Sequence, residues 1–126
     1  MAAMTAETAL ERSKEYLRVY GMLIRTAQQG GFVTYKDVAD VMGVSGDPKQ
    51  ITRKTGQMLR LIVDREHRSG RPVLSSVVVS ESNHQPVASF YSLASSLKLL
   101  PPDATKEQRT EFWRKELKRV FEEWAD

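Results

Sequence analysis

Apolar side chains recur at helical spacing along the first part of the chain. They return every three or four residues, a spacing that gives a helix one buried stripe. The members of this stripe are Tyr16, Tyr20, Leu23, Ile24 and Ala27. Two glycines, Gly30 and Gly31, follow and favour a left-handed helix end. We therefore expect a first helix over residues 8–29.

A second, shorter helix is predicted after the β-prone residues 32–34. Thr34 and Asp37 have the spacing of a capping box, in which the hydroxyl and the carboxylate each accept a backbone N–H. Four apolar side chains then share one face, namely Val38, Ala39, Val41 and Met42. Gly43 ends the pattern after about two turns. A helix this short is stable only when it packs on its neighbours.

The longest informative stretch opens with Asp47 as a helix cap and Pro48 at the first helical position. Its apolar side gathers Ile51, Thr55, Met58, Leu59, Ile62 and Val63. At about 100° per residue, the opposite side carries Lys49, Arg53, Gln57 and Arg60. We expect an amphipathic helix over residues 48–64, followed by a basic loop over residues 65–72.

Two β-prone segments follow, and we expect them to pair as a hairpin. Residues 73–79 form the strongest strand signal in the chain, and residues 87–91 form the second. The polar, turn-rich residues 80–86 separate the two segments. A hairpin that follows a helix-turn-helix is described as a wing.

A last amphipathic helix is predicted over residues 104–125, where Thr105 and Gln108 form a capping box. Its apolar stripe consists of Trp113, Leu117, Val120, Phe121 and Trp124. Such a stripe is most often part of the core. The alternative is that Trp113, Leu117, Phe121 and Trp124 form the seam of a homodimer or the docking surface for another protein.

Taken together, these elements predict one domain over residues 1–126, α+β and mainly helical. The expected architecture is a winged helix-turn-helix with a β-hairpin wing and an added C-terminal amphipathic helix. The helix-turn-helix and wing would occupy residues 31–92.

Charge is unevenly distributed in this chain of 126 residues, whose net charge is +3. Residues 48–71 contain only two acidic side chains, Asp64 and Glu66. Their basic side chains are Lys49, Arg53, Lys54, Arg60, Arg65, Arg68 and Arg71. A local surplus of this kind indicates an anionic partner.

The composition of the chain limits the reactions it could catalyse and the cellular compartment in which it is expected. The chain has no cysteine, which excludes disulfides, thiolate metal sites and a cysteine nucleophile. No apolar run is long enough to span a membrane, and residues 1–7 do not resemble a signal peptide. We expect a cytoplasmic protein that does not bind membranes.

The basic face of residues 48–64 suits double-stranded DNA. Arginine can bond guanine with two hydrogen bonds, glutamine can bond adenine, and lysine holds phosphates. The residues expected to contact the nucleic acid are Tyr35, Lys36, Lys49, Gln50, Arg53, Lys54, Gln57, Arg60, Arg68 and Arg71. The competing interpretation is an ordinary solvated helix face.

Residues 31–79 resemble the DNA-binding domain of alkylguanine-DNA alkyltransferases and of the related alkyltransferase-like proteins. The resemblance rests on Val33-Thr34-Tyr35, Val38-Ala39, Gly43, Gly46-Asp47-Pro48-Lys49, Arg53 and Gly56. It implies that Tyr35 presses on a phosphate and that Arg53 enters the base stack. One extra residue separates Pro48 from Arg53, and Arg71-Pro72-Val73-Leu74 stands where the family has its reactive Pro-Cys-His-Arg segment.

No sequence feature indicates catalysis, and we expect a protein that is not an enzyme. Alkyl transfer requires a thiolate, and the chain has none. Four glutamates of the last helix, Glu111, Glu116, Glu122 and Glu123, alternate with basic residues and are expected on a solvated face. We expect no metal and no cofactor. The predicted function is non-catalytic DNA binding, with a protein-interaction module or homodimeric scaffold as the alternative.

Overall fold

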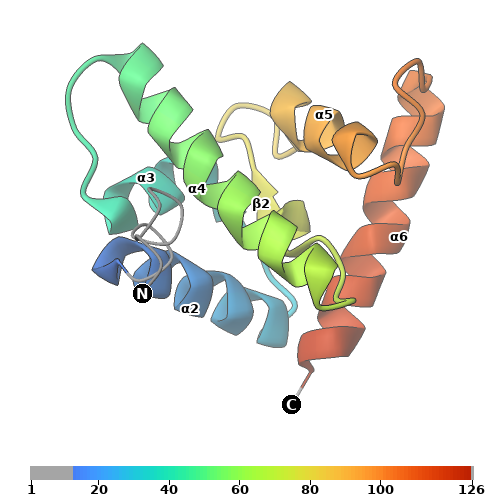
Figure 1. The fold of residues 1–126 in the computed structure, drawn as a ribbon, viewed down its shortest axis with the longest axis horizontal. Helices are drawn as coiled ribbons and strands as arrows, with labels where there is room; N and C mark the ends of the chain where they lie inside the picture. The colour runs from blue at the N-terminus through green and yellow to red at the C-terminus, as the bar shows by residue number, and fades with distance from the viewer. Residues whose placement is uncertain (1–12, 126) are drawn as a thin grey trace, which may run out of the picture.

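The computed structural model describes residues 13–125 (Figure 1). It is mainly helical with a small sheet. The helices are α2 (Lys14–Gln28), α3 (Tyr35–Met42), α4 (Pro48–Arg68), α5 (Ala88–Ser96) and α6 (Lys106–Trp124), with a 3-10 helix η1 (Leu74–Val77). The strands are β1 (Val33–Thr34) and β2 (Val78–Val79). The predicted first helix is confirmed over Lys14–Gln28, but its predicted start at residue 8 is wrong, because Ser13 is extended and caps the helix by accepting the Tyr16 N–H. Residues 8–12 lie outside the described residues.

The predicted start signals of α3 and α4 are confirmed. The Thr34 hydroxyl accepts the Asp37 N–H at 3.0 Å, and the Asp37 carboxylate accepts the Thr34 N–H at 2.9 Å. Gly43 closes α3 with a φ of 72°, a left-handed conformation that favours glycine. Asp47 then caps α4 by accepting the Lys49 N–H at 2.9 Å. Local sequence therefore determines how the chain turns between these two helices.

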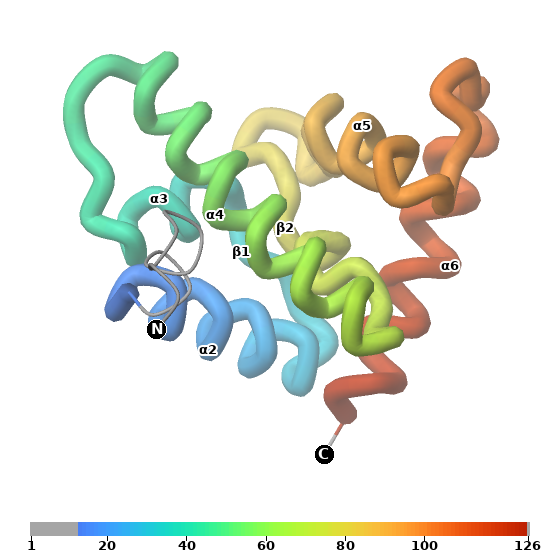
Figure 2. The backbone as a smooth tube through the Cα atoms, viewed as in Figure 1, coloured from blue at the N-terminus to red at the C-terminus, as the bar shows by residue number. Residues whose placement is uncertain are grey.

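The predicted hairpin is wrong, because the two strands are parallel. Val33 pairs with Val78, and Thr34 pairs with Val79. Parallel strands cannot be joined by a tight turn, and here α3, α4 and η1 form the crossover between them. Both strands lie behind α4 in Figure 2.

The predicted second strand, residues 87–91, is the beginning of helix α5. Phe90 and Ala94 lie one helical turn apart, and both are buried. The Phe90 ring lies 6.0 Å from the Phe112 ring of α6, measured between centroids. Burial of one helical face against α6 outweighs the β propensity of this segment.

The predicted strand over residues 73–79 is correct only for Val78 and Val79. Residues 74–77 form η1, and every one of them is buried. The Ser76 hydroxyl donates to the Val73 carbonyl at 2.7 Å, and Trp113 Nε1 donates to the Ser76 carbonyl at 2.9 Å. A fully buried segment has no solvent-facing side, so alternation along its sequence could not reveal its backbone conformation.

The core lies between α2, α4, α6 and η1. Leu23, Ile62, Val77 and Val120 are completely buried in it. Trp113 belongs to a second buried cluster with Phe90, whereas Leu117, Phe121 and Trp124 are half-buried against the core. Much of the aromatic stripe of α6 thus packs within the chain.

Candidate nucleic-acid interface on helix α4

Helix α4 has an exposed half and a buried half. Lys49, Arg53 and Lys54 are exposed, whereas Met58 and Ile62 of the second half are buried. The first turns extend beyond α3 at the upper left of Figure 1, away from α6. α4 ends at Arg68, four residues beyond the predicted end, so part of the predicted basic loop is helical.

The exposed half is cationic and has no internal counterions. No Asp or Glu lies between Asp47 and Asp64 in the sequence. Within the described residues, Lys49, Arg53 and Lys54 make no ion pair. Arg60, on the same face two turns beyond Arg53, pairs only loosely with Asp64 at 3.9 Å.

The two predicted glutamine contacts also face outward. Gln50 and Gln57 are exposed on α4. The amide of Gln57 lies within reach of a groove that runs along the helix. The structure therefore brings both amides and four of the predicted cations, Lys49, Arg53, Lys54 and Arg60, onto one exposed helix surface.

Tyr35 and Lys36 begin α3, beside this surface. Tyr35 is half-buried, and burial raises the pKa of its phenol, while a hydrogen bond with Ser89 lowers it. Its hydroxyl lies against α4 at Gly56, where an added Cβ would stand 3.2 Å away. Lys36 is exposed, and its backbone N–H donates to the Glu81 carboxylate. The Tyr35 hydroxyl is therefore used in contacts with α4 and α5.

A groove of about 340 Å³ separates α4 from α5. Small residues leave it open on both sides, with Gly56 on α4 and Ser89 and Ser92 on α5. Tyr35 contributes to its wall, and Arg60 is the one charged residue among the described residues that line it. The groove thus adjoins the cationic surface but is itself nearly neutral.

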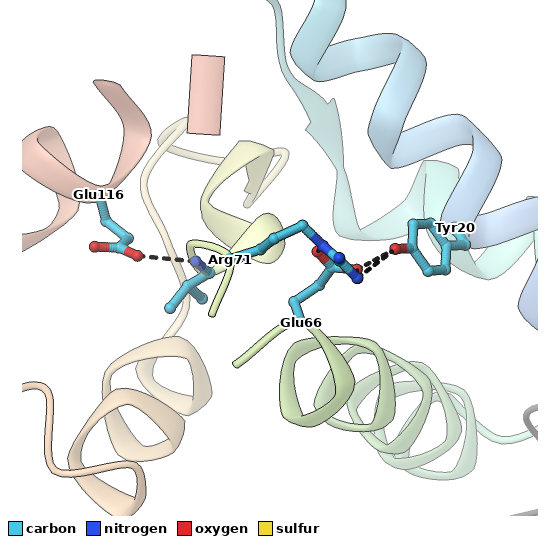
Figure 3. Close-up of polar contacts among 5 residues, drawn as sticks. Tyr20, Glu66, Arg71 and Glu116 are labelled. Carbon is cyan, nitrogen blue, oxygen red and sulfur yellow. Dashed lines mark hydrogen bonds and ion pairs between the residues drawn. The ribbon is translucent and has the colours of Figure 1, made fainter. Parts of the chain in front are cut away.

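Arg71 lies near the C-terminal end of α4, and its side chain binds residues within the protein. Its Nε bonds one Glu66 oxygen at 2.5 Å and its Nη2 bonds the other at 3.1 Å, while the Tyr20 hydroxyl also donates to Glu66 (Figure 3). Glu66 is completely buried. The hydrogen bond to Glu66 raises the pKa of Arg71, and burial raises the pKa of Tyr20 to about 12.

Arg68, the last residue of α4, is also distant from the exposed half. A helix of 21 residues is about 30 Å long, so Arg68 and Arg71 stand nearly a helix length from Lys49. The Arg68 Nε donates to the Asp64 carbonyl at 3.4 Å. The structure therefore separates these two arginines from Lys49, Arg53 and Lys54 at the start of α4.

Glu66 and Glu116 are buried carboxylates that were not expected from the sequence. Glu116, predicted on a solvated face, accepts the Val73 N–H at 2.8 Å and pairs with Arg119 at 3.0 Å. Glu66 does continue the four-residue spacing of Met58 and Ile62, which could have placed it on the buried side. Both carboxylates bind partners within the protein and have a structural role.

Metal binding has no candidate site among residues 13–125. Within that range, no group of three or more His, Cys, Asp or Glu side chains could hold a metal ion. No helix there is both long and apolar enough to cross a membrane.

Two residues of the alkyltransferase resemblance, Tyr35 and Gly56, line this groove. Tyr35 and Gly56 are in contact, and Arg53 is exposed one turn before Gly56. Val73 and Leu74, at the place of the reactive segment, are buried. Comparison of the chain with protein-family models, with curated proteins and with solved structures found no match.

Proposed function

We propose that this protein binds double-stranded DNA without altering it, with α3 and α4 acting as a helix-turn-helix. The supporting observation is the exposed first half of α4, which carries Lys49, Arg53 and Lys54 without ion-pair partners among the described residues. Cations without partners can release the counterions that surround DNA at no internal electrostatic cost.

The exposure along α4 suits a recognition helix. In helix-turn-helix proteins, the first residues of the recognition helix contact base edges, and the preceding helix lies near the backbone. Here the exposed residues also come first, and α3 precedes them. Arg53 and Gln57 would face the bases, with Lys49 and Lys54 at the flanking phosphates.

The proposed contact surface is smaller than the set expected from the sequence. Arg68 and Arg71 lie roughly 30 Å from the start of α4. We therefore assign DNA contact to the residues that share the exposed surface of α4, namely Lys49, Gln50, Arg53, Lys54, Gln57 and Arg60. Arg71 is assigned to the buried Glu66.

The first experiment is a salt titration of binding to a fluorescent duplex of arbitrary sequence, followed by anisotropy. We expect affinity to fall steeply with salt, and each lost phosphate contact to lower the slope of log K against log salt by about one. Arg53→Glu with Lys54→Glu should abolish binding. The charge-matched control is Lys118→Glu with Lys115→Glu on α6, which should leave binding nearly unchanged. Equal affinity of the two double variants would contradict the proposal.

A second candidate function is protein docking through α6. An open apolar depression of about 400 Å³ lies along this helix, lined by Leu117, Phe121 and Ala125 among others. Phe32 is 50% exposed, and its ring lies 6.3 Å from that of Phe121. Light scattering separates the two candidates, because a salt-insensitive dimer without DNA affinity would support docking alone.

A further inference from the structure

The groove between α4 and α5 has the composition of a small-molecule site. Its walls include the apolar side chains of Leu59, Val78, Phe90 and Leu93. Ligand sites are typically apolar clefts of about 300 to 1,000 Å³ with a few polar groups that fix orientation. At about 340 Å³, this groove accommodates a compact ligand of one or two rings.

Serines supply polar groups at the groove. Ser75 of η1 lines it together with Ser89, Ser92 and Ser96 of α5. Polar groups of this kind in an apolar cleft can fix the orientation of a ligand.

Arg60 gives the groove a positive charge. It is the one charged residue among the described residues that line the groove, and its side chain is 70% exposed. Its contact with Asp64, at 3.9 Å, is long and solvent-exposed, and such pairs contribute little. The guanidinium therefore retains N–H donors for a carboxylate.

We propose that this groove binds a small, planar aromatic acid, with the ring among the apolar walls and the acid group at Arg60. The proposal concerns the groove alone and does not require DNA binding. If both functions hold, the acid and the duplex compete, because Gln57 and Arg60 belong to both surfaces.

The test uses naphthoate and its neutral analogue naphthamide as probes, in separate titrations of the isotope-labelled full chain without DNA. We expect saturable shifts of the Gly56 and Ser75 backbone amide signals with naphthoate. Naphthamide should bind roughly tenfold more weakly, because it lacks the charge-assisted hydrogen bond to Arg60.

Variants identify the site. Arg60→Gln should lower the affinity for naphthoate roughly tenfold and leave the affinity for naphthamide unchanged. Arg114→Gln, beside the apolar depression of α6, should change neither. Ser92→Phe should fill the groove and abolish both, with the amide signals of α2 unshifted as proof of folding.

Three outcomes would overturn the proposal. The first is an absence of saturable shifts at Gly56 and Ser75. The second is equal affinity for naphthoate and naphthamide, which would show that the groove does not select an anionic ligand. The third is a set of shifts centred on Leu117 and Phe121, which would assign the probe to α6.

Discussion

The Tyr35 hydroxyl lies so close to Gly56 that a Cβ atom at residue 56 would stand 3.2 Å from it. This contact couples the start of α3 to the middle of α4. Glycine within a helix is normally destabilising, by roughly 1 kcal/mol relative to alanine. At this position the glycine leaves room for the phenol.

A double-mutant cycle measures that coupling. In the presence of Tyr35→Phe, we expect Gly56→Ala to raise the free energy of unfolding by about 1 kcal/mol, the ordinary helix gain. In the parent chain, the gain should be smaller because the tyrosine must shift. Urea unfolding of the four proteins gives both values. Equal gains in the two backgrounds would show that the contact is inconsequential.

Removal of the Arg71 guanidinium should be costly. Arg71→Leu leaves the carboxylate of Glu66 buried beside only the Tyr20 hydroxyl, and we expect a loss of about 2 to 4 kcal/mol in unfolding free energy. Combining Arg71→Leu with Glu66→Leu should recover much of that loss, because no uncompensated charge remains. If denaturant unfolding shows the double variant to be less stable than Arg71→Leu alone, the buried charge of Glu66 is not the cause of the loss.

Tyr20 should make stability fall at high pH. Burial, and then the hydrogen bond to Glu66, raises the pKa of its phenol from 10.0 to about 12. Because the folded pKa is the higher one, this stabilisation is complete below pH 10 and is lost as pH rises toward 12.

The prediction can be followed by the ultraviolet absorbance of the phenolate, in a protein with four tyrosines. A transition near pH 12 should be absent from Tyr20→Phe. The pH dependence of urea unfolding should also flatten between pH 10 and 12 in that variant. Persistence of both signals would assign them to another tyrosine.

Replacement by phenylalanine should destabilise the protein more at Trp113 than at Trp124. Trp113 Nε1 donates to the buried Ser76 carbonyl at 2.9 Å, so Trp113→Phe leaves that carbonyl without its donor. We expect a loss of about 2 kcal/mol or more from the missing hydrogen bond and the cavity. Trp124→Phe is the control, because Trp124 Nε1 has no hydrogen-bond partner in the part of the chain that the structure describes. Thermal unfolding should rank the two variants in that order.

Three helix starts were predictable from local signals, whereas the cap of α2 at Ser13 was missed. Thr34 with Asp37, Asp47 with Pro48, and Thr105 with Gln108 each act within one turn, so three helix starts could be located. The cationic face of α4 could also be identified, because helical periodicity alone brings Lys49 and Arg53 together.

The hairpin was mispredicted because its signals were not local. Residues 87–91 have β propensity, and α5 lacks a side-chain cap, so only the packing of Phe90 on α6 identifies the helix. Residues 73–77 are apolar or small throughout, which fits any buried backbone. The groove could not be predicted for the same reason, since Gly56 and Ser92 line one groove only when residues 88–96 form a helix.

Helix α4 also has unequal resistance to local fraying along its length. Within residues 48–54, Ile51 is the one side chain that is even half-buried, whereas the core holds the second half. Backbone amides of the first turns should therefore exchange with solvent by local opening, without global unfolding. A bound duplex would have to suppress that motion, and the lost entropy would lower affinity. In return, a helix end that adjusts its own conformation can follow phosphate backbones of different shape, which favours breadth of binding over strict sequence preference.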